Sequence, residues 1–128
     1  MAFPCTLLTP ERIAFEGEVE SVLLPGHDGE LGIFPGHADF LGQLGVGLAR
    51  LRTHGAESVL ALNGGYLRVE KGALTILAEG VLAPSEANRA VLEAEISVIL
   101  SEKPKQLPEA EARDARLAWA RARLRLLS

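Results

Sequence analysis

Glycine is confined to the first two thirds of this chain. All 13 glycines of the 128 residues lie at or before Gly80, and none occurs in residues 85–128, which carry nine alanines instead. Because glycine suits turns and bulges whereas alanine has the highest helix propensity, this change predicts a strand-rich first part and a helical second part. Pro84 and Ser85 mark the joint, so we expect two domains, residues 1–84 and residues 85–128.

Short runs rich in Val, Leu and Ile fill the first part, at the spacing typical of an antiparallel β-sandwich. The predicted strands are residues 3–8, 11–16, 19–24, 31–34, 46–52, 57–62, 66–70 and 73–78. Lys71 and Gly72 form the clearest hairpin turn, since Gly72 takes a positive φ without a Cβ clash. His54 and Gly55 are expected to turn another hairpin. No segment before Ser85 has helical periodicity over the length of a helix.

Helical spacing begins directly after the joint. Ser85 is the expected N-cap of a first helix, with Glu86 near the positive end of the helix dipole. Two apolar stripes follow, Ala87, Ala90, Val91, Ala94 and Val98 on one face and Leu92, Ile96 and Ile99 beside it. Two prolines in "KPKQLP", residues 103–108, interrupt the pattern, and a second helix fits residues 109–127. We therefore predict a mainly β plus α protein, an N-terminal antiparallel β-sandwich followed by a C-terminal antiparallel two-helix hairpin.

Charge and composition exclude several classes of function. The net charge is -4, and residues 1–84 hold ten acidic against five basic residues, so no general attraction for nucleic acid is expected. The single cysteine, Cys5, excludes an internal disulfide and is interpreted as a buried apolar side chain. The N-terminus lacks the pattern of a secretory signal, and no segment approaches the ~18 apolar residues of a membrane span. Membrane association is therefore expected through other chains only.

Histidines and carboxylates near residue 30 raise the question of catalysis or metal binding. His27, His37 and His54 are the only histidines, and Asp28, Glu30 and Asp39 lie close to the first two in sequence. A histidine with a carboxylate can act as general acid and base, but no nucleophile motif accompanies these residues. The histidine spacing matches no metal motif, although distant residues can converge in a fold. We expect no catalytic site and no metal site.

Arginines gather at the open end of the predicted helical hairpin. Antiparallel pairing brings Arg89 beside Arg121 and Arg125, close to Glu86. Clustered guanidinium groups can bind nucleotide phosphates or a partner's acidic surface, or can be paired with Glu86 and Glu93, or simply be solvated. The second helix is also basic and amphipathic near its end, so it can contact a membrane or a partner, or pack on the first helix.

Three stretches carry a resemblance to a known family. They are "GELGIFPGHADFLG" at 29–42, "LNGGYLRVEKGALTILAEG" at 62–80 and "SEANRA" at 85–90. Together they closely resemble the epsilon subunit of F-type ATP synthases of the bacterial or chloroplast type. The resemblance covers the whole chain and implies a non-catalytic central-stalk subunit of the proton-translocating rotor. Such a subunit links gamma to the c-ring, couples rotation to ATP synthesis and restrains ATP hydrolysis through its C-terminal hairpin.

The resemblance also implies partners and site residues. The loop Gly26, His27, Asp28, Gly29, Glu30 and Leu31 is expected to face the c-ring, and His37 to be a structural or subunit-interface residue. The gamma subunit is the expected partner of the sandwich, and the alpha and beta subunits become partners when the hairpin extends. No cofactor is required, and the expected location is the cytoplasmic face of the bacterial inner membrane, as a peripheral part of the complex.

The family's ATP-binding motif is kept only in part. "SEANRA" retains Arg89 and Ala90, but Glu86 stands where the motif has Asp, while "RARLRL" preserves Arg121 and Arg125. ATP is therefore a candidate regulatory ligand at Glu86, Arg89, Arg121 and Arg125. The alternative from another class is a stand-alone ligand-binding or enzymatic β-barrel with a helical tail.

Overall fold

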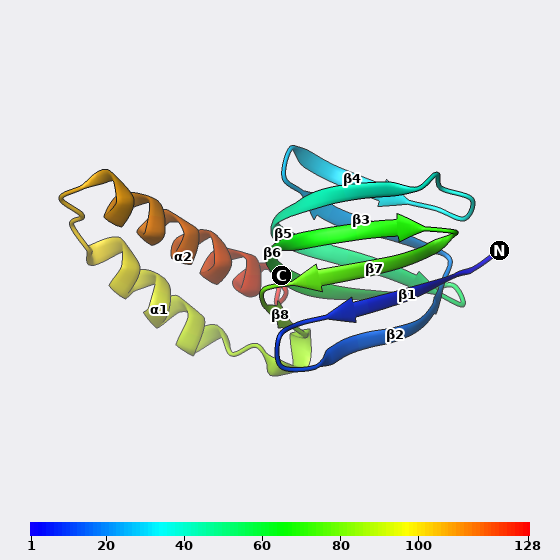
Figure 1. The fold of residues 1–128 in the computed structure, drawn as a ribbon. Coiled ribbons are helices and arrows are strands. Elements are labelled where there is room, and N and C mark those ends of the chain that lie inside the picture. The colour runs from blue at the N-terminus through cyan, green and yellow to red at the C-terminus, as the bar shows by residue number, and fades with distance from the viewer.

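The computed structural model describes residues 1–128 and divides them into a strand-built body and a helical hairpin (Figure 1). The elements in chain order are β1 (Phe3–Leu8), β2 (Ile13–Val19), β3 (Ser21–Gly26), β4 (Gly29–Ile33), β5 (Phe40–Thr53), β6 (Ala56–Glu70), β7 (Ala73–Ala78), β8 (Val81–Leu82), η1 (Pro84–Glu86), α1 (Arg89–Ser101) and α2 (Leu107–Arg125). The predicted fold class, a β-sandwich followed by a two-helix hairpin, is confirmed.

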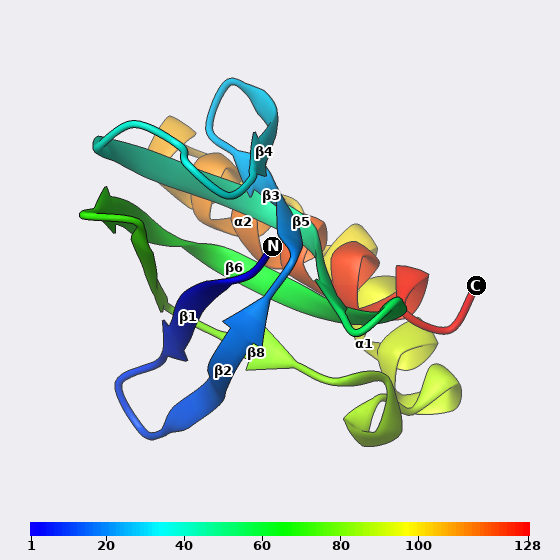
Figure 2. The same cartoon turned by 90° about the vertical axis from the view of Figure 1, so that its right-hand side faces the viewer.

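All eight strands belong to one hydrogen-bonded sheet in the order β2-β1-β7-β6-β5-β3-β4, with β8 paired to β6. Neighbouring strands are antiparallel except β1 and β7, which run parallel. Figure 2 shows β3 and β4 on one side and β1 and β2 on the other, with β5 and β6 between them. The sheet thus folds over on itself, and its two halves form the layers of the sandwich.

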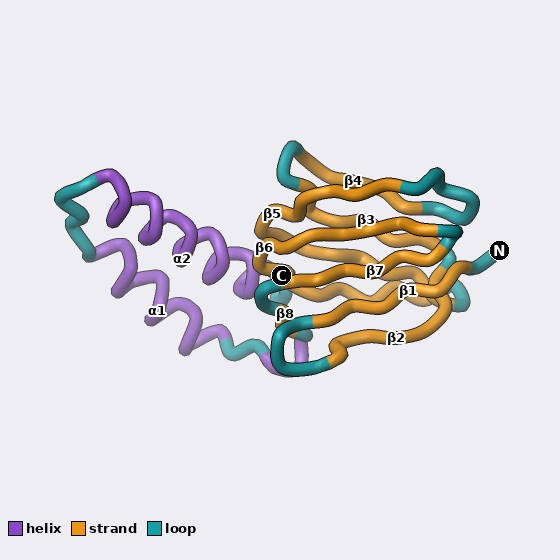
Figure 3. Tube along the Cα trace, viewed as in Figure 1, coloured by secondary structure: helices purple, strands orange, loops and turns teal.

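The central strands β5 and β6 are longer than the sequence predicts. They span 14 and 15 residues and pair along almost their whole length (Figure 3). The prediction of separate strands at 57–62 and 66–70 is therefore wrong. Gly64 and Gly65 lie inside β6 with φ of 65° and 116°, values that let the backbone bend without ending the strand.

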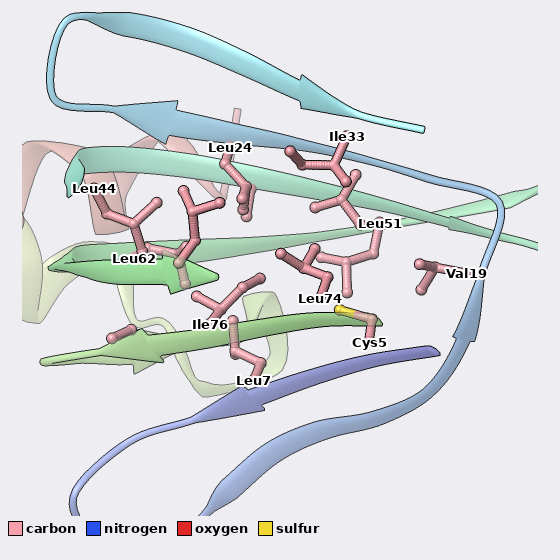
Figure 4. Close-up of a cluster of buried hydrophobic side chains, with 14 of the residues drawn as sticks. Cys5, Leu7, Val19, Leu24, Ile33, Leu44, Leu51, Leu62, Leu74 and Ile76 are labelled. Atoms are coloured by element: carbon pink, nitrogen blue, oxygen red, sulfur yellow. The ribbon is translucent and has the colours of Figure 1, made fainter. Parts of the chain in front are cut away.

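The core lies between the two layers and is apolar throughout. Sixteen buried side chains form it, and Figure 4 shows Cys5, Leu7 and Ile76 among those that point into it. No charged or polar side chain is buried. Burial raises the pKa of the Cys5 thiol to about 12, because a thiolate loses its hydration there. Cys5 therefore behaves as the small apolar side chain expected from the sequence.

The helices pack through the second of the two predicted stripes. Leu92 and Ile99 of α1 are buried, and Ile99 clusters with Leu117 and Ala120 of α2. The stripe that contains Val91 and Val98 faces outward, with exposed fractions of 60% and 62%. Leucine and isoleucine remove more apolar area from water than alanine and valine, so their stripe takes the inner position.

Ser85 is not the N-cap of the first helix, contrary to prediction. Pro84–Glu86 form the short 3-10 turn η1, and Asn88 caps α1 by accepting a hydrogen bond from the Val91 amide at 3.1 Å. Ala87 and Asn88 are both extended, so the chain changes direction between η1 and α1. The second helix begins at Leu107, because Pro108 is tolerated in a first helical turn.

Polar contacts fasten the two helices to each other. Arg123 forms an ion pair with Glu95, and Arg116 donates to Glu102 through Nη1 at 3.0 Å. Arg113 Nε donates to the Ile99 carbonyl at 3.1 Å. The hairpin projects from one end of the sandwich, which it contacts mainly through α2 against β5 and β6 (Figure 1). Neither helix has the length and apolar content that crossing a membrane would require.

Candidate functional site

Four apolar side chains stand side by side on the outer face of the sandwich. Ile13 of β2 pairs with Leu8 of β1, Leu8 pairs with Leu77 of β7, and Leu77 pairs with Tyr66 of β6. We call these four residues the apolar row. Ile13, Leu77 and Tyr66 are 58%, 53% and 57% exposed, and the row lines a groove of about 520 Å³. Contiguous exposed apolar surface of this kind is typical of docking sites.

The turn beside the row is held rigidly by one threonine. Thr9 Oγ1 donates to the Arg12 carbonyl at 3.2 Å and accepts from the amides of Glu11 and Arg12 at 3.3 and 3.1 Å. Glu11 and Arg12 of this turn line the groove together with Glu79 and give it a charged rim. An apolar centre with a polar rim is the usual anatomy of a protein interface.

The predicted loop Gly26–Leu31 lies at the turn between β3 and β4. Gly26 pairs with Gly29 across this turn, His27 and Asp28 form its tip, and the His27 amide donates to the Gln43 carbonyl at 2.9 Å. Together with Phe40–Gln43 the loop lines a second groove, whose rim includes the 73% exposed Leu41. The sequence thus identifies one wall of this groove and misses the other.

His37 makes contacts within its own loop. Its Nδ1 lies 2.7 Å from the Ala38 carbonyl, its amide donates to the Phe34 carbonyl at 3.1 Å, and its ring meets Phe40 edge-on at 6.0 Å between centroids. Asp39 accepts from the Lys71 amide at 3.0 Å and so fixes the loop to the β6–β7 turn. The contacts of His37 are thus to its own loop and to the ring of Phe40.

The four nucleotide candidates make separate contacts. Arg89 Nη2 donates to the Leu127 carbonyl at 2.9 Å, which brings Arg89 to the end of α2 as antiparallel pairing predicts. Arg125 lines a groove with Pro25, Glu30 and Arg50, and Arg121 is exposed. The distances place neither Arg125 nor Arg121 in an ion pair.

Glu86 contacts the sandwich instead of the arginines of the hairpin. Its carboxylate accepts from the Ala83 amide at 2.9 Å and from Arg12 at 3.4 Å. The Ala83 hydrogen bond is the main cause that lowers the pKa of Glu86, and the charge of Arg12 adds to it. The sequence gives no sign of Arg12 as the partner, since 74 residues separate the two.

No group of three or more His, Cys, Asp or Glu side chains lies close enough together to hold a metal ion. The three histidines are spread over different turns, with His27 in the β3–β4 turn, His37 before β5 and His54 between β5 and β6. The surfaces that remain for function are the apolar row, the groove beside residues 26–31 and the arginines of the hairpin.

Comparison with known proteins decides the family. Residues 2–84 match the family model described as ATP synthase, Delta/Epsilon chain, beta-sandwich domain. The chain belongs to the ATP synthase epsilon chain family. Curated members of this family align over nearly its whole length. An ATP synthase epsilon chain of Prochlorococcus marinus is 33% identical over 98% of this chain and 97% of its own, and a chloroplastic one of Calycanthus floridus is 31% identical over 98% and 96%.

Solved structures share the fold of this epsilon-family chain at low sequence identity. A chain in the Euglena gracilis mitochondrial ATP synthase structure that contains OSCP, F1 and the c-ring superposes with a TM-score of 0.87, at 16% identity over 99% of this chain and 82% of that one. A chain in the central stalk and c-ring structure of the Tetrahymena thermophila enzyme gives 0.69 at 15% identity, covering 98% and 96%. Both likenesses include the helices as well as the sandwich.

Proposed function

We propose that this chain is a non-catalytic central-stalk subunit of a proton-translocating ATP synthase. The observation that carries the proposal is the apolar row, which is exposed on a chain of the epsilon family. A stalk subunit acts by contact with other chains, and the row supplies an apolar surface for such contact. The structural relatives named above come from assemblies of F1 with the c-ring and of the central stalk with the c-ring, which supports the same role.

The gamma subunit is the partner that we propose for the apolar row. Tyr66 lies at the β6 end of the row beside Leu77, and tyrosine is enriched among the residues that anchor protein interfaces. Glu11 and Glu79 on the rim favour basic groups on the opposing surface. The acidic balance of residues 1–84 then supports both the affinity and the rate of association.

The loop Gly26–Leu31 is the proposed contact with the c-ring. It lies at the β3–β4 end of the sheet, whereas β2, which carries Ile13, lies at the opposite end of the strand order. Two partners can therefore be held at once by different regions of one rigid sheet. Association with the cytoplasmic face of a bacterial inner membrane would follow from the complex, without any membrane segment in this chain.

The hairpin is the proposed restraint on ATP hydrolysis. Its two helices share a cluster of only three buried residues and are fastened largely by ion pairs near their surface. Such a hairpin is weakly held compared with the sandwich and can change its arrangement. The exposed Arg121 and Arg125 would then meet acidic surfaces of the alpha and beta subunits.

ATP is the regulatory ligand that we propose for the hairpin arginines. Arg121 and Arg125 are outside any ion pair and are available to phosphate oxygens. Isothermal titration of the full chain with ATP tests this, with the double variant Arg89→Ala/Arg125→Ala as the control. A heat of binding that is measured with the parent chain and lost in the variant supports ATP binding. If the parent chain gives no heat of binding, ATP is rejected as a ligand.

Reconstitution of the complex tests the main proposal. The full chain and residues 1–84 are each assembled with the other subunits, and ATP hydrolysis is measured. We expect both forms to assemble, since the row and the loop 26–31 lie in the sandwich, and the shorter form to hydrolyse ATP faster. A chain that never binds gamma, or that turns over a substrate by itself, would favour the stand-alone β-barrel instead.

A further inference from the structure

Arg12 and Glu86 form the only ion pair between the sandwich and the helical part of the chain. All other ion pairs lie within residues 50–57 or within the hairpin. No other side-chain hydrogen bond joins the two parts except the bond from Ala83 to the same Glu86 carboxylate. The Glu86 carboxylate thus accepts hydrogen bonds from the Arg12 guanidinium in the β1–β2 turn and from the Ala83 amide next to the joint.

Both ends of this pair are anchored in stiff local structure. Arg12 belongs to the turn that the Thr9 hydroxyl holds through three hydrogen bonds. Glu86 ends the 3-10 turn η1, in which its amide donates to the Ala83 carbonyl at 3.0 Å. Two extended residues, Ala87 and Asn88, then lead directly into α1. Fixing Glu86 therefore fixes the point from which α1 departs.

The remaining contact between hairpin and sandwich is the packing of α2 against β5 and β6. Trp119 of α2 lies beside Gly80 and Arg125 lies beside Gly47, and Ala122 of the same helix is fully buried. Burial of apolar area in this contact keeps α2 close to the sandwich. A hydrogen-bonded ion pair does depend on geometry.

We propose that the Arg12–Glu86 pair is a clamp that sets the orientation of the helical hairpin on the sandwich. Packing of α2 keeps the hairpin close, and the clamp selects one angle. Because Arg12 also lines the groove of the apolar row, a partner that covers the row would cover the clamp as well. The clamp is a property of the chain alone and can be tested without any partner.

Distance measurement between two spin labels tests the clamp in the full chain. Ser58→Cys in β6 and Gln106→Cys at the far end of the hairpin provide exposed label sites, while the buried Cys5 thiol stays unlabelled. The parent should give one narrow distance distribution. Arg12→Gln and Glu86→Gln should each raise the population of other distances about two- to fivefold, the range that an exposed ion pair supports.

A double variant and a rescue variant distinguish the loss of the ion pair from a local structural effect of either substitution. The double variant Arg12→Gln/Glu86→Gln should match each single variant, because either change already removes the pair. Glu86→Gln keeps an oxygen that can accept from Ala83, so only the charge is lost. Arg12→Lys should restore the parent distribution, since one nitrogen makes the contact.

The matched control breaks another exposed ion pair. Arg52→Gln removes a contact to Glu57 within the sandwich, where the Arg52 side chain is about as exposed as that of Arg12. Its distance distribution should equal that of the parent. Parent-like distributions in both Arg12→Gln and Glu86→Gln would overturn the proposal, as would equal broadening in Arg52→Gln. Circular dichroism confirms that each variant is folded before it is compared.

Discussion

Arg123 lies with its guanidinium carbon 5.0 Å from the centre of the Trp119 ring, one helical turn away, while the same guanidinium pairs with Glu95 of the other helix. The side chain is only 17% exposed, and its Nε also donates to the Trp119 carbonyl at 3.3 Å. A cation–π contact, a cross-helix ion pair and a backbone hydrogen bond thus meet at one residue.

Removing this side chain should therefore loosen the hairpin. We expect Arg123→Ala to lower the free energy of unfolding of the hairpin by about 1.5–3 kcal/mol, the scale of a hydrogen bond to a charged group. Fluorescence of Trp119, the single tryptophan, follows the unfolding. Arg121→Ala on the exposed face of the same helix is the control and should change it little. Equal effects of the two substitutions would contradict a special role for Arg123.

The Glu102–Arg116 pair makes the hairpin sensitive to acid. The hydrogen bond from Arg116 is the main cause that lowers the pKa of Glu102 below its ordinary value of 4.5. Stabilisation is therefore complete above pH 4.5 and is lost as the pH falls through the lower, folded-state pKa. Thermal unfolding followed by circular dichroism at neutral and acid pH should show a smaller acid-induced change in Glu102→Gln than in the parent.

The control for acid sensitivity is Glu111→Gln in the exposed part of α2. The Glu111 carboxylate takes part in no ion pair, so the loss of its charge should leave the acid-induced change as large as in the parent. An unchanged acid response in Glu102→Gln would assign the sensitivity to other carboxylates.

A charge placed in the apolar row should weaken the proposed binding of gamma. We expect Leu77→Asp to reduce the affinity at least about tenfold, or ~1.4 kcal/mol, because a carboxylate would lose water without gaining a partner. Leu77 is 53% exposed and points away from the core, so the fold should remain. Isothermal titration with the gamma subunit measures the change. Val98→Asp, on the exposed face of α1, is the matched control, and an equal loss there would argue against the row.

Gly65 should tolerate no side chain. A Cβ at this position would lie 1.9 Å from the Leu77 carbonyl oxygen, and φ is +116°. We expect Gly65→Ala to lower the free energy of unfolding by about 3 kcal/mol or more, through strain and displacement of β7. Gly72→Ala has open space around its Cβ and should cost only about 1–2 kcal/mol. Chemical denaturation of both variants compares them directly.

Much of the fold can be read from the sequence because local chemistry agrees with it. The glycine-to-alanine change separates strands from helices, and the hairpin at Lys71 and Gly72 forms with both residues at positive φ. His54 and Gly55 turn the other hairpin in the same way. At these places backbone preference and tertiary structure point to the same conformation, so no long-range information is needed.

Long-range geometry decides the parts that the sequence prediction misses. Both stripes of α1 are apolar, and the packing of α2 against Ile99 shows which of them faces inward. The N-cap moves from Ser85 to Asn88 because residues 84–86 close a separate turn held by Glu86. The apolar row joins four strands, yet its Tyr66–Leu77 pair follows from the predicted turn at residues 71 and 72. The Tyr66–Leu77 pair is therefore the part of the apolar row that the sequence could have predicted.

The long hairpin of β5 and β6 also has a mechanical consequence. Its two strands pair from Phe40 with Val69 at one end to Thr53 with Ala56 at the other, and both layers of the sandwich are joined through them. A force applied along these strands loads many hydrogen bonds in shear at the same time. The body should therefore resist twisting as a single stiff piece, so that a torque applied at one end of β5 and β6 reaches the other end with little loss.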